Sequence, residues 1–147
     1  MEEEKPRLKA PLKVLFLCTE NACRSQLAEA LVNHFFGDRV RSFSAGVRPK
    51  WVHPLALQVL SELGIETSGL RSKHVDEFKG QEFDLVVTLC DSAAAECPIF
   101  PGAKRRLYLP FPDPARSGNP ETFRRVRDEM LEKLKELFGK EASRENP

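Results

Sequence analysis

The segment KVLFLCTENACRS, residues 13–25, decides the fold that this chain is predicted to adopt. Its first part, Lys13–Cys18, is a short and continuous apolar run, which is typical of a parallel strand buried on both faces. A short polar loop follows. From Ser25 onward the apolar side chains recur with helical spacing, at Leu27, Leu31 and Phe35. The segment therefore predicts a buried strand, a tight loop and the start of a helix.

Outside this segment the chain alternates between strand-like and helix-like stretches. Further strands are predicted at Val40–Ser44, Asp84–Cys90 and Arg106–Leu109. Further helices are predicted to begin at Pro54 and Pro120, because proline suits the first helical turn. This order predicts an α/β fold, a three-layer sandwich around a central four-stranded parallel sheet. Cys18 and Cys90 both end a predicted strand, and parallel sheets bind ligands at that edge, so we expect both in one site.

Length and composition indicate one globular domain. The chain has 147 residues, of which 41% are hydrophobic and 31% charged, and this balance excludes general disorder. We expect residues 12–139 to form a single domain between a charged N-terminal extension, 1–11, and a polar tail, 140–147. The formal net charge of +1 lacks the basic excess of proteins that bind nucleic acid.

Hydropathy gives an expectation for the location of the protein. No apolar run approaches the roughly 18–20 residues of a membrane span. The N-terminus lacks the apolar stretch of a secretory signal. These features predict a soluble, cytoplasmic protein without a membrane partner. We also expect it to be a monomer.

The loop after the first predicted strand has the features of an anion site. Successive N–H groups in such a loop turn inward as a nest, and the helix N-terminus adds partial positive charge. Arg24 adds a planar guanidinium that holds two oxygens of a tetrahedral anion. The predicted oxyanion-binding residues are Thr19, Glu20, Asn21, Ala22, Cys23 and Arg24.

The same surroundings act on Cys18. A free thiol has a pKa of about 8.5, and helix N-termini and nearby cations lower it to roughly 3.5–7.5. Cys18 is therefore expected to be a thiolate and a nucleophile at neutral pH, with the Ser25 hydroxyl donating a hydrogen bond to its sulfur. The alternative is an inert, buried cysteine beside a surface arginine.

The sequence contains four cysteines: Cys18, Cys23, Cys90 and Cys97. In a reducing cytosol they stay thiols, free for catalysis or metal binding. Their spacings, C-x4-C and C-x6-C, differ from the tight C-x2-C pairs of structural zinc sites. We therefore predict no metal site, and zinc held by these sulfurs is the alternative.

Two stretches of the sequence resemble a known family. The C-x5-R-S pattern resembles the phosphate loop of the low-molecular-weight protein tyrosine phosphatases. The longer run CTENACRSQLAE resembles that of the thioredoxin-coupled arsenate reductases, which share this fold. The sequence VTLC at 87–90, with Cys97-Pro98 after it, resembles their redox segment. The similarity extends from Lys13 to Phe138 and implies a flavodoxin-like topology with one catalytic domain.

This resemblance implies a relay of three thiols that reduces arsenate to arsenite. Cys18 attacks arsenic(V), Cys90 attacks the Cys18 sulfur, and Cys97 then attacks Cys90. Thioredoxin is the implied electron donor, with glutaredoxin and glutathione as the alternative, and no tightly bound cofactor is expected. A disulfide needs Cα atoms about 4.4–6.8 Å apart, so we expect segment 91–96 to unwind or loop out on oxidation. Cys23 has no role in the relay and is assigned to packing.

Asp113, in the sequence FPDP, resembles the aspartate-proline acid of the family. Pro114 restricts Asp113 to extended conformations, which helps to orient its carboxyl group. The implied role is to protonate the departing oxygen. The alternative is a surface aspartate in a turn.

Several polar residues near the loop carry weaker signals. Ser44 and Glu29 resemble positions that orient the loop or bind a monovalent cation in some reductases. Lys73 stands where cation-binding members carry an acidic residue, so its ammonium is expected to take the place of the cation. Asn21 is expected to hold the shape of the loop. Glu20 is expected to point outward, because a carboxylate repels an anionic ligand.

Two other functions fit the same residues. A phosphatase would hydrolyse phosphate monoesters through a Cys18 phosphoenzyme, although no paired tyrosines follow the predicted acid to grip an aryl ring. Phosphate and arsenate are near-isosteres, so weak phosphatase activity is expected even in a reductase. A protein that binds oxyanions or senses redox state without catalysis is the third alternative.

Overall fold

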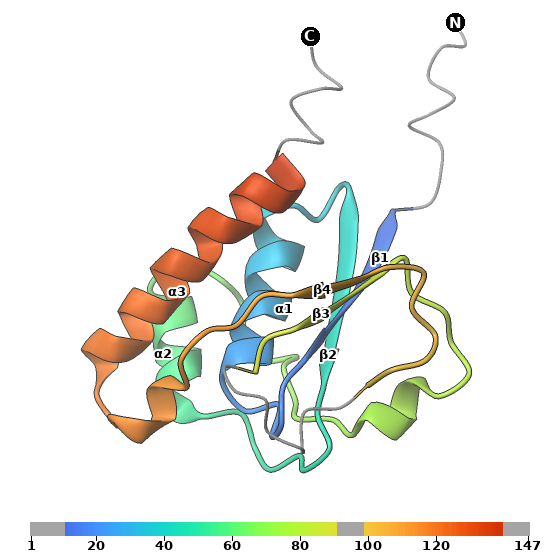
Figure 1. The fold of residues 1–147 in the computed structure, drawn as a ribbon. Helices are drawn as coiled ribbons and strands as arrows, with labels where there is room; N and C mark the ends of the chain where they lie inside the picture. Colours follow the sequence, from blue (N-terminus) through green and yellow to red (C-terminus); the bar gives the residue numbers. More distant parts are fainter. Residues whose placement is uncertain (1–10, 91–98, 140–147) are drawn as a thin grey trace, which may run out of the picture.

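The computed structural model describes residues 11–90 and 99–139 (Figure 1). The strands in these ranges are β1 (Leu12–Leu17), β2 (Val40–Ala45), β3 (Leu85–Thr88) and β4 (Arg106–Tyr108). The α-helices are α1 (Arg24–Phe35), α2 (Pro54–Ser61) and α3 (Pro120–Leu134). Shorter helical turns are η2 (Val75–Phe78), η3 (Pro114–Arg116) and η4 (Lys135–Gly139).

The strands form one parallel sheet in the order β2-β1-β3-β4. At its end β1 lies between both neighbours, with Leu17 paired to Ala45 of β2 and to Thr88 of β3. The carboxyl ends of these strands therefore meet at one edge of the sheet. The α/β fold with a four-stranded parallel sheet, predicted from the sequence, is confirmed.

The central strand is buried on both faces, as its continuous apolar run predicted. Val14 and Phe16 pack into the larger core with α1, α2 and α3. Leu15 and Leu17 pack into a smaller core on the opposite face, where aromatic rings predominate. Figure 1 shows the three α-helices together on one side of the sheet and η2 on the other. In the described ranges, the third layer thus consists of a short turn and loops.

The predicted helix starts are present, with their caps. Asn119 Oδ1 accepts a hydrogen bond from the Thr122 N–H at 3.0 Å, directly before Pro120. His53 Nδ1 accepts from the Leu55 N–H at 3.1 Å at the start of α2. A backbone N–H at the first helical position has no acceptor within the helix. Proline has no N–H, so it suits the start of both helices.

Some boundaries differ from the sequence prediction. Strand β3 ends at Thr88, two residues before Cys90, because pairing with β4 stops at Tyr108. Leu89 still donates its N–H to Leu17 O at 2.9 Å, so the chain follows β1 to the site. Helix α3 ends at Leu134 and continues as the wider π-helical turn η4.

No helix within the described ranges combines the length and the apolar character needed to cross a membrane. Cys97 and segment 91–96, where unwinding was predicted, lie outside the described residues. The same holds for residues 1–10 and 140–147.

Candidate active site

The carbonyl oxygens of the loop after β1 are bonded to surrounding protein. The donors come from other segments: Arg48 N–H to Thr19 O (2.9 Å), Ser72 Oγ to Glu20 O (2.9 Å) and His53 N–H to Ala22 O (3.0 Å). Within residues 11–90 and 99–139, the N–H groups of residues 19–23 donate to no protein acceptor. These N–H groups are therefore left for a ligand, as an anion nest requires.

Asn21 stabilises the conformation of this loop through its backbone and its buried side chain. Its φ of 53° lies in the left-handed region, which asparagine tolerates better than most residues. The side chain is fully buried. Asn21 Nδ2 donates to Ser25 Oγ at 2.7 Å, and Asn21 Oδ1 accepts from the Lys73 N–H at 2.8 Å. The loop is thereby tied both to the start of α1 and to a distant segment.

Cys18 directly follows β1, at the base of the loop. Its sulfur lies 2.9 Å from Ser25 Oγ, and both residues are almost completely buried. Ser25 belongs to the first turn of α1, so the helix N-terminus faces the sulfur. The structure thus brings together the predicted nucleophile and the predicted hydroxyl donor.

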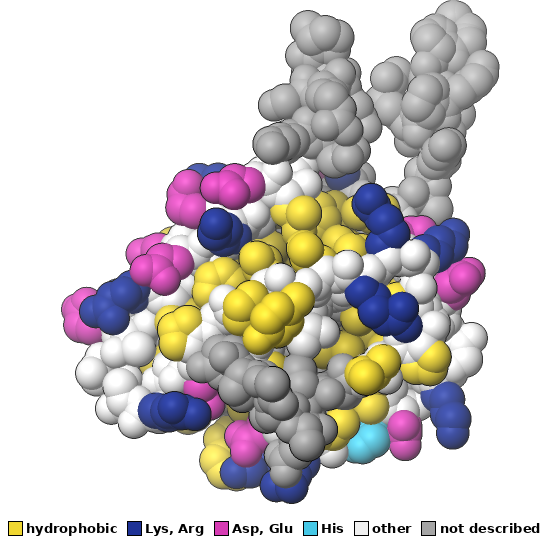
Figure 2. All heavy atoms as spheres, viewed as in Figure 1, with side chains coloured by type: hydrophobic (Ala, Val, Ile, Leu, Met, Phe, Trp, Pro, Cys, Tyr) yellow, Lys and Arg dark blue, Asp and Glu magenta, His cyan; other side chains and the backbone are white. Residues whose placement is uncertain are grey.

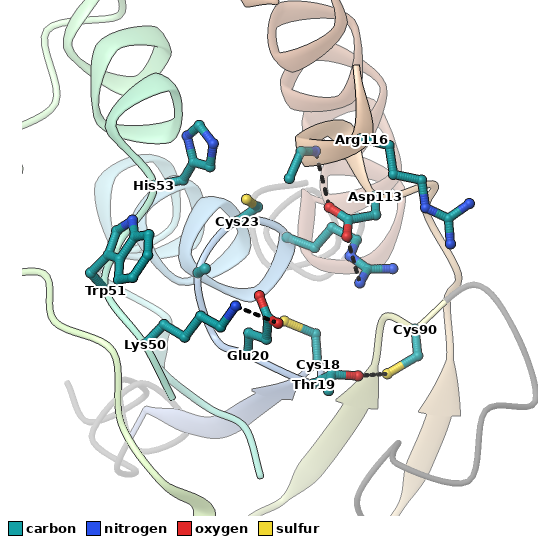
Figure 3. A pocket seen from close by; sticks show the side chains of 13 residues that line it. Cys18, Thr19, Glu20, Cys23, Lys50, Trp51, His53, Cys90, Asp113 and Arg116 are labelled. Atoms are coloured by element: carbon teal, nitrogen blue, oxygen red, sulfur yellow. Dashed lines mark hydrogen bonds and ion pairs between the residues drawn. The ribbon is translucent and has the colours of Figure 1, made fainter. Parts of the chain in front are cut away.

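Arg24 and Asp113 meet at the rim of the loop. Arg24 Nη1 donates to Phe111 O at 3.1 Å, and its Nη2 lies 3.9 Å from Asp113 Oδ2. Asp113 Oδ1 accepts from the Ala115 N–H at 3.0 Å and so caps η3. Because this bond occupies Oδ1, the other carboxylate oxygen is the one that faces Arg24 (Figure 3).

These residues border one cavity of about 400 Å³ (Figure 3). Cys18, Arg24, Cys90 and Asp113 all line it. Ser25 lies behind Cys18 and contacts its sulfur. The structure therefore brings together every predicted catalytic residue that it describes.

Cys90 reaches the cavity from the end of β3. It is 3% exposed, and its sulfur lies 3.9 Å from Thr19 Oγ1, at the limit of a hydrogen bond to sulfur. Cys90 is disulfide-bonded, whereas Cys18 and Cys23 are free thiols. A sulfur that takes part in a disulfide therefore lines the same cavity as Cys18.

Cys23 also lines the cavity, but its thiol is unsuited to attack. Burial raises its pKa to about 12, and the negative charges of Asp113 and Cys18 add to this rise, against the opposing effect of Arg24. Since the thiolate is the reactive form, Cys23 stays protonated and unreactive near neutral pH. This agrees with its assignment to packing.

Lys50 and Arg116 line the cavity although no sequence pattern pointed to them. Glu20 also lines the cavity, so the expectation that it points outward is wrong. Lys50 Nζ lies 3.3 Å from Glu20 Oε2, and this ammonium offsets the repulsion between the carboxylate and an anionic ligand. Next to Lys50, Trp51 lines the same cavity with 62% of its surface exposed. These residues come from irregular segments, where periodicity gives no signal. On the face of the molecule that includes β4, Figure 2 shows apolar side chains in the middle and charged side chains scattered around them.

Gly46 was also missed, and it lies directly beneath the loop. A Cβ at this position would lie 2.5 Å from Thr19 O and 2.6 Å from Cys18 O, closer than any real contact of this kind. Gly46 N–H donates to Lys73 O at 3.0 Å, which aligns the 73–75 segment with the end of β2. A glycine directly after a strand was the available signal for this close approach.

The described histidines serve as caps or lie at the surface. His53 and His74 accept N–H groups at the starts of α2 and η2, and His34 is exposed at the end of α1. Among the described residues, no three or more His, Cys, Asp or Glu side chains are grouped as a metal site would require.

A strand-end cysteine, a short loop and an arginine at a helix start have the arrangement expected of an oxyanion site with a cysteine nucleophile. Residues 13–146 match the family described as low molecular weight phosphotyrosine protein phosphatase. The chain belongs to this family.

Several of the similar proteins are named arsenate reductases. That of Halalkalibacterium halodurans is 42% identical over 127 residues, covering 83% of this chain and 91% of the relative. That of Bacillus subtilis is 41% identical over 129 residues, covering 84% and 93%. A solved arsenate reductase in the phosphate-binding state superposes with a TM-score of 0.77 at 30% identity, covering 88% and 98%. The thioredoxin-dependent arsenate reductase of Corynebacterium glutamicum superposes with a TM-score of 0.65 at 31% identity. The match covers 92% of this chain and 65% of that one.

Proposed function

We propose that this chain is an arsenate reductase that draws its electrons from thioredoxin through Cys18, Cys90 and Cys97. The observation that carries the proposal is the presence of Cys90 in the cavity of Cys18. A phosphatase needs the loop, the arginine and an acid, whereas a reductase also needs thiols that supply two electrons. The arsenate reductases at 41–42% identity support the same choice.

In the first step the loop N–H groups and Arg24 bind arsenate, and the Cys18 thiolate attacks arsenic. A sulfur–arsenic bond forms and an arsenic–oxygen bond breaks. Asp113 protonates the departing oxygen, which leaves as water. The placement of Asp113 Oδ2 beside Arg24 supports this role, because an anion held by the guanidinium lies next to the acid.

In the second step the Cys90 thiolate attacks the Cys18 sulfur. A Cys18–Cys90 disulfide forms as the sulfur–arsenic bond breaks, the electron pair of that bond stays on arsenic, and arsenic(III) leaves as arsenite. Cys97 then attacks Cys90, which releases Cys18 as a thiolate and leaves a Cys90–Cys97 disulfide. Thioredoxin reduces this disulfide and closes the cycle. We place this cycle in the cytoplasm, in a monomer whose catalytic domain is residues 12–139.

Arsenate-dependent oxidation of NADPH, coupled through thioredoxin and thioredoxin reductase, tests the proposal. Wild type should turn over, and Cys18→Ser, Cys90→Ser and Cys97→Ser should each lose at least about a hundredfold in rate, because each removes one thiol of the relay. Full turnover by both Cys90→Ser and Cys97→Ser would exclude the relay. A parallel assay with glutaredoxin, glutathione and glutathione reductase decides between the two donors.

The phosphatase alternative is tested on the same preparations with p-nitrophenyl phosphate. Because phosphate matches arsenate in shape and charge, we expect slow hydrolysis that depends on Cys18 and is independent of Cys90. Efficient hydrolysis together with no reduction of arsenate would establish the phosphatase instead.

A further inference from the structure

Glu20 places a carboxylate at the cavity in which we propose that arsenate binds. Its side chain is 44% exposed and lines this cavity together with Lys50 and Trp51. Its negative charge acts on the interior: burial is the main cause that raises the pKa of the Cys23 thiol, and Glu20 is among the charges that add to this rise. A carboxylate at this place weakens the binding of any oxyanion unless another group compensates for it.

Lys50 is the group that compensates, and its position is fixed by several contacts. Its Nζ lies 3.3 Å from Glu20 Oε2 (Figure 3) and 5.9 Å from the centre of the Trp51 ring, within reach of a cation–π contact. The Lys50 N–H donates to Ser72 Oγ at 3.1 Å, and Ser72 Oγ donates to Glu20 O at 2.9 Å. One hydroxyl therefore bridges the backbones of Lys50 and Glu20, which keeps the ammonium next to the cavity.

The charged side chains around the cavity differ in how firmly they are held. Arg24 is almost completely buried and lies 3.9 Å from Asp113 Oδ2. Figure 3 shows Asp113 and Arg116 on the opposite side of the cavity from Lys50. The side chains of Lys50 and Glu20 are 49% and 44% exposed, and ion pairs exposed to this extent are weak. An anion that enters the cavity can therefore displace the carboxylate from the ammonium.

We propose that Lys50 is a further substrate-binding residue and that Glu20 is the counter-ion which it exchanges for the substrate. Without a ligand the ammonium pairs with Glu20. When an oxyanion binds to the loop, the ammonium pairs with one of its outer oxygens and the carboxylate turns toward solvent. Because both side chains act through their charge, the affinity of the cavity depends on the charge of the ligand.

This exchange deepens the proposed function and rests on it for its role in turnover. Arsenate is an anion near neutral pH, whereas arsenite is uncharged. Once arsenic is reduced, the ammonium no longer has an anionic ligand to pair with, and Glu20 recovers it. Lys50 therefore favours the binding of the substrate without retaining the product.

The test uses two tetrahedral anions that keep a fixed charge, sulfate with two negative charges and methanesulfonate with one. Their dissociation constants are measured at constant ionic strength from the NMR shifts of the amide groups of residues 19–23, without arsenate or an electron donor. We expect Lys50→Met to weaken sulfate binding about tenfold and Glu20→Gln to tighten it about fivefold, with clearly smaller changes for methanesulfonate, because the Coulomb energy scales with the charge of the ligand.

The double variant tests the exchange itself. In Glu20→Gln the ammonium has no carboxylate to leave, so adding Lys50→Met should cost more sulfate affinity there than it costs in the wild-type background. In the arsenate assay, Lys50→Met should raise KM about tenfold and change kcat much less, since the lost interaction is one of binding.

A matched pair of control variants removes the same charges far from the cavity. Lys135 Nζ lies 3.4 Å from Glu132 Oε2 in an exposed ion pair, and neither residue lines the cavity. Lys135→Met and Glu132→Gln should leave both dissociation constants unchanged. Unchanged sulfate affinity in Lys50→Met, equal changes for the two anions, or purely additive effects in the double variant would overturn the inference. Because these titrations involve no reduction, their failure is separate from a failure of the wild type to reduce arsenate.

Discussion

Arg24 Nη2 and Asp113 Oδ2 lie 3.9 Å apart across the cavity that the Cys18 sulfur lines. One residue begins α1 and the other precedes η3, so separate elements deliver the cation and the acid. An oxyanion that binds the guanidinium places one of its oxygens beside the carboxyl group. In the proposed mechanism, this pair would join substrate binding to proton transfer.

Replacement of this acid should slow the first chemical step. Asp113→Asn keeps the cap on η3, since an amide oxygen also accepts the Ala115 N–H, but it removes the proton donor. We expect kcat for arsenate reduction to fall by about a hundredfold, the usual range for a general acid, with a smaller change in KM. Steady-state kinetics check this, with the exposed Asp76→Asn as control. A kcat equal to that of wild type would remove Asp113 from the mechanism.

Loss of the Ser25 hydroxyl should slow the attack by Cys18 and leave phosphate affinity almost unchanged. In Ser25→Ala the Cys18 sulfur loses its hydroxyl partner at 2.9 Å, whereas Arg24 and the loop N–H groups remain. We expect kcat to fall about tenfold and phosphate affinity to stay within about twofold, since one charge-assisted hydrogen bond is removed. Rapid-quench kinetics and calorimetry measure the two effects, with Ser61→Ala as control. The opposite pattern, weak phosphate binding with an unchanged rate, would make Ser25 a binding residue.

The sequence pattern predicted the parts of the site that are contiguous in the chain. Cys18, Arg24 and Ser25 converge because a strand, a short loop and a helix leave few arrangements for eight successive residues. The resemblance of FPDP to the family acid predicted Asp113 as the acid, but it did not predict the contact with Arg24. Lys73 was expected near Ser44 and Glu29 only through the resemblance. Lys50 and Gly46 were not predicted in position, because segment 46–53 is irregular. Their places follow from hydrogen bonds across the fold that no local periodicity encodes.

A side chain at position 46 should displace the loop. In Gly46→Ala the new Cβ would overlap the carbonyl oxygens of Thr19 and Cys18, so the backbone must move. We expect a loss of about 1–3 kcal/mol in the free energy of unfolding, together with much weaker phosphate binding. Denaturant titration and calorimetry measure both quantities. Gly69→Ala is the matched control, because a Cβ added there would meet nothing within 4 Å; equal behaviour of the two variants would contradict the close approach.

The buried Cys23 thiol should affect the pH dependence of stability at alkaline pH. Its pKa is about 12 in the folded protein, against an ordinary value of 9.0, so the unfolded chain ionises first as pH rises. Its contribution to stability is therefore complete below about pH 9 and is lost between pH 9 and 12. Cys23→Ala should flatten the decline of the melting temperature in this window. It should also retain arsenate turnover, and a loss of turnover would place this thiol in the relay.

The central claim is that Cys18 bonds to arsenic and Cys90 then removes its electrons. A single turnover of fully reduced protein with arsenate, without thioredoxin, tests this most directly by counting arsenite and mapping disulfides with mass spectrometry. We predict one arsenite for each protein molecule and a Cys90–Cys97 disulfide, and no arsenite from Cys90→Ser. Arsenite formed at the wild-type yield by Cys90→Ser, or none formed by wild type, would contradict the account.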